Sequence, residues 1–165
     1  MMIEIHKENL VIGLISDTHG LFRSEIKPIF AGVDYIIHAG DIGDRAVLYQ
    51  LEEIAPVTTV LGNTDSCIKL EDIYESAILI TPCVSIYIIH DAGNLDLDPA
   101  KAGFNAVVHG HTHAPSIHNR EGILFVNPGS AGPRRHSLPV SVGKLAISGD
   151  KLEAAIVNLN LDHQG

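Results

Sequence analysis

The amino-acid sequence predicts an α/β protein, a four-layer αββα sandwich of two mixed β-sheets flanked by helices. In residues 10–63, short β-branched apolar runs alternate with segments of helical periodicity. This βαβαβ pattern implies a parallel sheet with helical crossovers. From residue 76 onward, apolar runs are joined by tight turns such as REG and GDK, so this half is expected to be mostly β. Two mixed sheets packed face to face, with helices outside, accommodate both halves better than one doubly wound sheet.

The first half contains three expected strands, each of which stops at a polar or glycine-containing turn: LVIGLIS (10–16), DYIIHAG (34–40) and VTTVLGN (57–63). Two segments between these strands have apolar residues at helical spacing, LFRSEIKPIFAG (21–32) and DRAVLYQLEEIA (44–55). The second of these opens on Asp44, a residue type that caps helix N-termini.

The second half is expected to begin with a β-hairpin formed by SAILITP (76–82) and VSIYIIH (84–90). A buried strand, NAVVHG (105–110), follows the hairpin. The remaining expected strands are PSIHN (115–119), GILFVNP (122–128), VSVGKLAISGD (140–150) and LEAAIVNLN (152–160).

Length and composition favour a single domain over residues 1–165, because the chain is 45% hydrophobic and lacks a linker rich in proline, serine or glycine. No apolar run is long enough to span a bilayer, and the N-terminus lacks the features of a signal peptide. We therefore expect a soluble, cytoplasmic protein.

Cys67 and Cys83 form neither a disulfide framework nor a CxxC pair, and we expect them to be buried without a role. The formal charge of −9 argues against general nucleic-acid binding.

Side chains able to bind a metal follow five successive expected strands. They lie in SDTHG (16–20), HAGDIGD (38–44), GNTD (62–65), IIHDAG (88–93) and VHGHTH (108–113). The carboxyl ends of parallel strands meet at one edge of a sheet, so these loops are expected to form one site. Core packing gives no reason for a carboxylate, amide or imidazole at the end of every strand. The ten histidines of the chain, several of them in these segments, therefore indicate a functional site.

These segments, in this order, resemble the motifs DxH, GDxx(D), GNxD, H and GHxH of the calcineurin-like metallophosphoesterase superfamily. NPGS (127–130) follows the last histidine motif, which makes the chain most similar to the small phosphodiesterase branch that includes Vps29-like proteins. The resemblance implies two divalent transition-metal ions. One ion is assigned to Asp17, His19 and His113, the other to Asn63, His90 and His111, with Asp41 bridging both.

The residue types suit such a pair of ions. Residues two positions apart, such as His111 and His113, can project to the same side of an extended segment and each reach one of two ions roughly 3.5–4 Å apart. A carboxylate such as Asp41 has two oxygens and can serve both ions. Mixed nitrogen and oxygen ligands suit manganese, the ion we expect first, and also nickel, zinc, iron or cobalt.

The resemblance and the charges together predict a phosphodiesterase. Two divalent ions, two carboxylates and a bridging hydroxide leave roughly one positive charge, which matches a phosphodiester monoanion. We expect in-line attack of the metal-bridging hydroxide on phosphorus, with no covalent enzyme intermediate. The predicted catalytic residues are the same seven side chains that are assigned to the metals.

Four residues are predicted to contact the small phosphodiester substrate: Asn63, Asn127, Ser130 and Arg134. Asn127 and Ser130 can instead shape the loop beside the metals or form a plain turn. Arg134, with its neighbour Arg135, can clamp a phosphate or lie in a solvated loop.

Other polar residues near the motifs have two interpretations. His38 and His109 precede two of the motifs and are expected to support or line the site rather than bind metal. Asp44 or Asp65 can accept a hydrogen bond from a metal-bound imidazole, or serve as a cap or turn residue. The histidines outside the motifs are expected at the surface: His6, His118, His136 and His163.

Two positions depart from the family pattern. Thr64 stands where many members have a histidine that assists the leaving group, so no general acid is identified. In the fourth motif Asp91-Ala92 replaces the usual Gly-His, which adds a carboxylate. Asp91 can repel a dianionic phosphate, which favours diesters, or it can turn away from the site.

Two other functions stay open at this point. One is a non-catalytic, Vps29-like scaffold that binds partner proteins and retains a metal site. The other is a two-metal hydrolase of an amide or a carbonyl ester. All seven expected ligands are present, which favours the phosphoesterase. The physiological substrate and the oligomeric state, including a homo-oligomer, are left open by the sequence.

Overall fold

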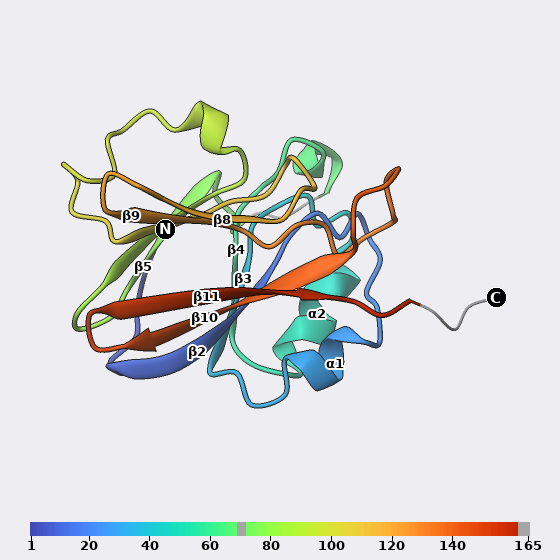
Figure 1. Cartoon of the computed structure of the whole chain (residues 1–165). Helices are drawn as coiled ribbons and strands as arrows, with labels where there is room; N and C mark the ends of the chain where they lie inside the picture. The colour runs from blue at the N-terminus through green and yellow to red at the C-terminus, as the bar shows by residue number, and fades with distance from the viewer. Residues whose placement is uncertain (69–71, 162–165) are drawn as a thin grey trace.

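The computed structural model describes residues 1–68 and 72–161, in which two β-sheets face each other (Figure 1). The elements follow in the order β1 (Met2–Glu4), β2 (Asn9–Ile15), α1 (Ile26–Ile29), β3 (Tyr35–His38), α2 (Arg45–Glu52), β4 (Val57–Thr59), the 3-10 helix η1 (Asp65–Cys67), β5 (Ser76–Ile80), β6 (Ser85–Ile89), the 3-10 helix η2 (Ala92–Asn94), β7 (Ala106–Val108), β8 (Ser116–Arg120), β9 (Ile123–Asn127), β10 (Ser141–Ser148) and β11 (Lys151–Asn158).

Both sheets are mixed, as the sequence predicts. The strands of the described residues form a six-stranded sheet in the order β1-β5-β6-β7-β9-β8 and a five-stranded sheet in the order β11-β10-β2-β3-β4. Strands β2, β3 and β4 are parallel, and the β5–β6 hairpin is antiparallel, which confirms both expectations. The sequence analysis did not identify β1, a strand of only three residues that pairs parallel with β5 and forms one edge of the sheet.

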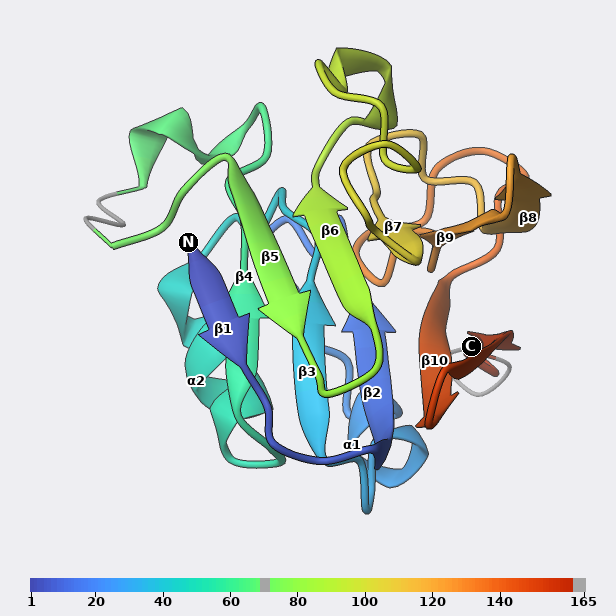
Figure 2. The same ribbon diagram turned by 90° about the vertical axis from the view of Figure 1, so that its left-hand side faces the viewer.

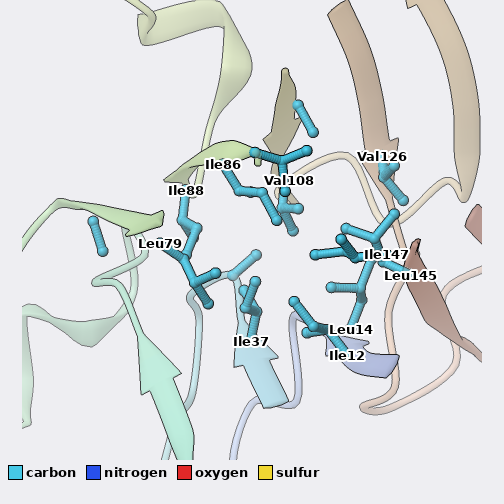
Figure 3. Packing of buried hydrophobic residues seen from close by; sticks show 14 of the residues in the cluster. Ile12, Leu14, Ile37, Leu79, Ile86, Ile88, Val108, Val126, Leu145 and Ile147 are labelled. Carbon is cyan, nitrogen blue, oxygen red and sulfur yellow. The ribbon is translucent and has the colours of Figure 1, made fainter. Parts of the chain in front are cut away.

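The main core lies between the two sheets (Figure 3). Side chains alternate along each strand, so Ile12 and Leu14 of β2 face the six-stranded sheet, whereas Ile15 faces the opposite side. Across the interface, Ile86 and Ile88 of β6 meet them in the same cluster. This apolar contact holds the two sheets together and aligns the ends of their strands.

The helices cover the other face of the five-stranded sheet (Figure 1). Asp44 is the N-cap of α2, and its Oδ1 accepts a hydrogen bond of 2.8 Å from the amide of Ala46, as the sequence predicts. The first expected helix, 21–32, is much shorter in the structure and spans only Ile26–Ile29. Pro28 explains the difference, because a proline is tolerated only in the first turn of a helix.

The outer face of the six-stranded sheet has a different cover. Tyr87, Val107 and Phe125 on this face pack against Leu95 and Phe104. Leu95 and Phe104 belong to the long connection between β6 and β7, whose only described helix is the single 3-10 turn η2. The sandwich of two sheets is therefore flanked by α-helices on one side and by an irregular segment on the other.

Strands β2 and β3 of one sheet and β6 of the other end at the same edge of the molecule (Figure 2). Figure 2 shows the arrows of β2, β3 and β6 pointing to one end of the molecule, where the loops that follow them lie together. Polar residues at the carboxyl ends of these strands are therefore brought close to one another, although the strands belong to different sheets.

Two cysteines lie elsewhere than predicted. Both Cys67 and Cys83 are exposed, because Cys67 ends the short helix η1 and Cys83 lies in the turn between β5 and β6. The expectation that they are buried was wrong.

In the described part of the chain, the helices are too short to cross a bilayer.

The carboxylate of Asp34 ties the start of β3 to the start of β2. Its Oδ2 accepts a hydrogen bond of 2.8 Å from the Val11 amide, and its Oδ1 lies 3.0 Å from Lys7 Nζ. The pKa of Asp34 lies below its usual value of 3.8, mainly because of the hydrogen bond from the Val11 amide and to a smaller extent because of Lys7. The folded state thus favours the ionised carboxylate.

We predict that Asp34→Asn lowers the melting temperature at pH 7, because it removes the negative charge that strengthens the hydrogen bond from the Val11 amide and pairs with Lys7, a loss of about 1 kcal/mol. A depressed pKa stabilises the fold above the unfolded-state value, and this stabilisation is lost as pH falls through the folded-state value. The difference in melting temperature between the two proteins should therefore shrink below pH 3.8. Thermal unfolding followed by circular dichroism from pH 7 to 3 measures it. Glu153→Gln, on the exposed side of β11, is the control, and a constant difference at all pH values would contradict the prediction.

Candidate metal centre

The seven predicted ligands all lie in loops at the carboxyl ends of strands. The loop after β2 carries Asp17 and His19, and the loops after β3 and β4 carry Asp41 and Asn63. From the other sheet, His90 follows β6, and His111 and His113 follow β7. The structure brings all seven together, through contacts between residues that are up to 94 positions apart in the sequence.

One group consists of Asp17, His19 and His113, whose potential ligand atoms all lie within 4.8 Å of one another. The Oδ1 atom of Asp17 is 3.3 Å from Nε2 of His113. The Nε2 atoms of His19 and His113 are 3.4 Å apart. These three residues are the set that the family resemblance assigns to one ion.

The second group surrounds His90. Its Nε2 atom lies 3.4 Å from Oδ2 of Asp41 and 3.1 Å from Oδ1 of Asn63. The same Asn63 oxygen is 3.1 Å from Nδ1 of His111. His90 is held in place by its Nδ1 atom, which lies 2.7 Å from the carbonyl oxygen of Ala39.

Two carboxylates connect the groups. Asp41 Oδ2 lies 3.4 Å from His90 Nε2 and 3.8 Å from His19 Nε2, so it reaches both sides, as expected for a bridging ligand. Asp17 Oδ1 also lies between the groups, 3.3 Å from His113 Nε2 and 3.9 Å from His90 Nε2. The structure therefore places Asp17 closer to the second group than its assignment to a single ion suggests.

The residues present fit divalent cations. Asp17 Oδ1 is buried and has no hydrogen-bond partner in the part of the chain that the structure describes, which is rare for a buried carboxylate oxygen. The Nε2 atom of His113 lies 3.3 Å from this oxygen and 3.4 Å from Nε2 of His19. Imidazole nitrogens with carboxylate and amide oxygens form the mixed donor set that first-row transition metals bind.

Burial and local hydrogen bonds set the charges of the centre. Burial raises the pKa of Asp17, against the hydrogen bond from Ser16 and the nearby histidines. Burial alone would also raise the pKa of Asp41, but hydrogen bonds from His90 and from the Thr64 amide outweigh it and lower that pKa. Burial lowers the pKa of His113, which keeps its ring neutral and able to bind a cation.

The backbone is strained at most of the ligands. Positive φ angles occur at Asp17 (54°), His19 (45°), Asp41 (54°), His111 (72°) and His113 (61°). Residues other than glycine seldom adopt this left-handed conformation, and such strain persists only where the surrounding structure imposes it. Five of the seven predicted ligands therefore depend on the rest of the fold for their orientation.

Asp65 supplies much of this support. Its carboxylate is buried and accepts hydrogen bonds from three backbone amides, those of Ile42, Gly43 and Gly62. It thereby ties the Asp41 loop to the Asn63 loop. Neither Asp65 nor the helix cap Asp44 forms a hydrogen bond to an imidazole in the described residues, so the cap and turn interpretation of both is confirmed.

The loop of His111 approaches Asp17 closely. The His111 amide donates a 3.1 Å hydrogen bond to Asp17 Oδ2, and a Cβ atom at Gly110 would overlap the Ser16 hydroxyl. Asn127 fastens this loop, because its Nδ2 donates to the Gly110 carbonyl at 3.0 Å and to Thr112 Oγ1 at 2.9 Å.

The remaining predicted substrate residues differ in exposure. Asn127 and Ser130 are buried, and Ser130 Oγ donates to the backbone carbonyl of Asp17 at 2.9 Å. Both therefore hold the loops and neither faces solvent. Arg134 is exposed. The pKa of His113 is lowered first by burial and then by the positive charge of Arg135, while the carboxylate of Asp17 acts in the opposite direction.

The other histidines lie as follows. His38 is fully buried, its Nδ1 accepts from the Gly40 amide and its Nε2 contacts Thr18 Oγ1 at 2.9 Å, so it supports the loops. Burial lowers the pKa of His38 to about 3. His109 lines a different cavity, on the outer face of the six-stranded sheet. Three histidines are exposed as predicted, His6, His118 and His136, and His163 lies outside the described residues.

Asp91 lies beside the centre. Its Oδ2 is 3.8 Å from Nε2 of His111, and its Oδ1 accepts a hydrogen bond of 2.8 Å from the Gly93 amide as the cap of η2. Of the two interpretations of the sequence, the structure favours the one in which this carboxylate faces the site.

A groove of about 490 Å³ extends from His90, His111 and Asn63. Its walls include Tyr87 and Ile89. The sequence analysis did not identify these residues, although the period of two along SIYII places both on the face opposite the core residues Ile86 and Ile88.

Comparison with known proteins gives consistent results. Residues 10–150 match the model of the calcineurin-like phosphoesterase superfamily domain. The chain is 35% identical over 161 residues to a probable metallophosphoesterase of Methanocaldococcus jannaschii, covering 90% of this chain and 81% of the relative. It is 31% identical over 137 residues to a phosphodiesterase of the same organism, covering 72% of this chain and 82% of the relative.

Solved structures share the fold at low sequence identity. The Vps29 of Chaetomium thermophilum superimposes with a TM-score of 0.79 at 17% identity, covering 94% of this chain and 90% of that protein. The same protein in complex with a cyclic peptide superimposes with a TM-score of 0.74, covering 96% and 92%. Similarity at this level of identity establishes the architecture.

We predict that Asp65→Ala lowers the free energy of unfolding by about 2–4 kcal/mol, because it leaves three backbone amides without their acceptor. It should also weaken metal binding, since the Asp41 and Asn63 loops lose their connection. Urea unfolding and calorimetric titration with Mn²⁺ measure the two effects. Asp44→Ala, which removes an exposed helix cap, is the control and should cost about 1 kcal/mol with unchanged metal affinity. Equal metal affinity in both variants would show that Asp65 does not organise the centre.

Proposed function

Because this chain belongs to the calcineurin-like phosphoesterase superfamily, we propose that it is a phosphodiesterase that depends on two divalent metal ions. In this proposal it hydrolyses a phosphodiester by in-line attack of hydroxide on phosphorus. The observation that carries the proposal is the convergence of the seven predicted ligand side chains at the strand ends, around a buried Asp17 oxygen that has no hydrogen-bond partner among the described residues.

In this proposal, one ion is held by Asp17, His19 and His113, the other by Asn63, His90 and His111, and Asp41 serves both. When bound, such ions act as Lewis acids and lower the pKa of water, which makes hydroxide available near pH 7. Manganese is the ion we expect first, with nickel, zinc, iron and cobalt as alternatives.

The protein's own residues orient the reaction. The short contacts at Asp17, Asp41 and Asn63 fix the ligand positions before the substrate arrives, so little reorganisation is needed in the transition state. Two carboxylates set against two divalent ions and one hydroxide leave roughly one positive charge, which suits a diester monoanion. Arg134, the predicted phosphate contact, is exposed, and burial together with the charge of its neighbour Arg135 lowers the pKa of His113, so we propose that this pair of arginines attracts the phosphate.

Two features support a preference for diesters over monoesters. Asp91 places a carboxylate 3.8 Å from His111, where it repels a dianion more than a monoanion. Thr64 is exposed and occupies the position of the leaving-group histidine of many family members, so a poor alkoxide leaving group receives no proton there. A relative that is 31% identical is a phosphodiesterase, which agrees with this preference.

A protein-binding scaffold is the second candidate function. The observation that favours it is the TM-score of 0.74 with a Vps29 that binds a cyclic peptide. The complete ligand set argues for catalysis, because a scaffold has no need of it. Three further expectations stay predictions from the sequence: that the protein acts in the cytoplasm, that it forms a single domain, and that it has no general affinity for nucleic acids.

We predict that metal-stripped protein cleaves bis(p-nitrophenyl) phosphate only after a divalent metal is added back, and faster than it cleaves p-nitrophenyl phosphate. Asp41→Asn and His111→Ala should each reduce diester cleavage about a hundredfold or more, because each removes a metal ligand. Release of p-nitrophenolate at 405 nm follows both reactions, and His6→Ala, an exposed histidine outside the site, is the control.

The absence of turnover with every metal, in protein that binds two ions per chain, would reject the enzyme and leave the scaffold. Cleavage of carbonyl esters but not of phosphodiesters would point instead to a hydrolase of the carbonyl class.

We predict that Asp91→Asn raises kcat/KM for the monoester about three- to tenfold relative to the diester, because it removes one negative charge a few ångströms from the site. The asparagine keeps an oxygen that can accept the Gly93 hydrogen bond, so the loop should persist. Asp98→Asn removes the same charge from the neighbouring segment and should leave the ratio unchanged. An unchanged ratio in Asp91→Asn would mean that this carboxylate does not select the substrate.

A further inference from the structure

A second cavity, of about 690 Å³, lies on the outer face of the six-stranded sheet. Its floor is formed by residues of β8 and β9 and by His109, which follows β7, and its other wall is the segment 92–100. None of the seven metal-site residues lines it. Cavities of roughly 300–1,000 Å³ are the usual size for sites that hold a small molecule.

His109 is the unusual residue of this cavity. Its side chain continues the outward-facing row of β7 beyond Val107, and the residue is only 7% exposed. Neither of its ring nitrogens has a hydrogen-bond partner among the described residues. Buried polar atoms are nearly always paired, so these two nitrogens point to a partner outside the protein chain.

The floor of the cavity offers a stacking surface. His118 and Phe125 are direct partners across the β8–β9 pair, and their rings stack with centroids 5.2 Å apart and an interplanar angle of 11°. Phe125 also meets the ring of His109 edge-on at 6.4 Å. Because His118 is exposed while one face of its ring covers Phe125, its other face is available to a planar ligand.

The rim of the cavity carries charges of both signs. Arg120 is on the same face as His118, and the carboxylates are those of Asp96, Asp98 and Glu121. Three carboxylates against one guanidinium disfavour an anionic ligand, while together they supply hydrogen-bond donors and acceptors. A neutral ligand with both donors and acceptors matches this rim.

We propose that this cavity binds a neutral, planar heteroaromatic compound, such as a nucleoside or a pyridine amide, which stacks on His118 and is hydrogen-bonded by His109. The site is independent of the proposed phosphodiesterase activity, because it shares no residue with the metal ligands. It is close enough to influence them, since its wall begins directly after Asp91 and His109 precedes the Gly110-His111 loop.

The experiment is a titration of the protein loaded with Zn²⁺, a diamagnetic ion that leaves nearby amide signals visible, followed by ¹H–¹⁵N correlation spectra. The probes are adenosine and nicotinamide, which are neutral, and nicotinate, which has the same ring as nicotinamide but carries a negative charge. Saturable shifts are expected for both neutral compounds, centred on residues 92–100 and 116–125. Nicotinate is expected to bind at least about tenfold more weakly than nicotinamide.

Three variants identify the groups that bind. His109→Leu fills the same buried position with an apolar side chain but removes both ring nitrogens. It should weaken binding of the neutral probes about tenfold. His118→Ala removes only an exposed ring, so it tests stacking even if His109→Leu fails to fold, and it should weaken binding several-fold. His6→Leu is the matched control and should bind as the unchanged protein does.

Several results would overturn the proposal. These are the absence of saturable shifts in the two segments with both neutral probes, equal affinity for nicotinate and nicotinamide, and unchanged affinity in His118→Ala or in a folded His109→Leu. Because binding is read from the spectra and adenosine has no phosphate, a protein without phosphodiesterase activity can still confirm the site.

Discussion

The apolar contact between the two sheets is the constraint on which the rest of the molecule depends. Ile12 and Leu14 pack against Ile86 and Ile88, and this packing sets β2 and β6 side by side with their carboxyl ends at one edge. Each sheet alone would present only part of the ligand set. The centre exists because burial of apolar surface, which has no chemical role, fixes two groups of strand ends within a few ångströms of each other.

The loops above that edge are held by hydrogen bonds to backbone rather than by the ligands themselves. Asp65 binds three amides, Asn127 holds the Gly110 carbonyl and Ser130 holds that of Asp17. These contacts hold the loops in which five of the predicted ligands have positive φ angles. The strained backbone turns carboxylates and imidazoles toward one point. Two carboxylates so close together repel each other unless a positive charge lies between them. A divalent cation of the kind that this family implies would supply the missing interaction at the Asp17 oxygen.

The segment between β6 and β7 joins the two sites of the molecule. It starts at Asp91, whose carboxylate faces His111, and continues as a wall of the outer cavity that contains His109. Neighbouring residues of one short loop, His109 and His111, therefore serve opposite faces of the sheet. A ligand that orders the outer segment would touch the same backbone that positions the metal ligands.

The sequence by itself determined most of the strands, the β5–β6 hairpin, the Asp44 cap and the seven side chains that we propose as metal ligands, because these depend on local pattern and on motifs. Tertiary structure decided what depends on contacts between distant segments. It showed that β1 pairs with β5 and that Cys67 and Cys83 are exposed. It also decided that Asp17 reaches both groups of predicted ligands and that His109 is buried with no hydrogen-bond partner among the described residues. No local pattern encodes these features, because each is set by which surfaces meet when the two sheets pack.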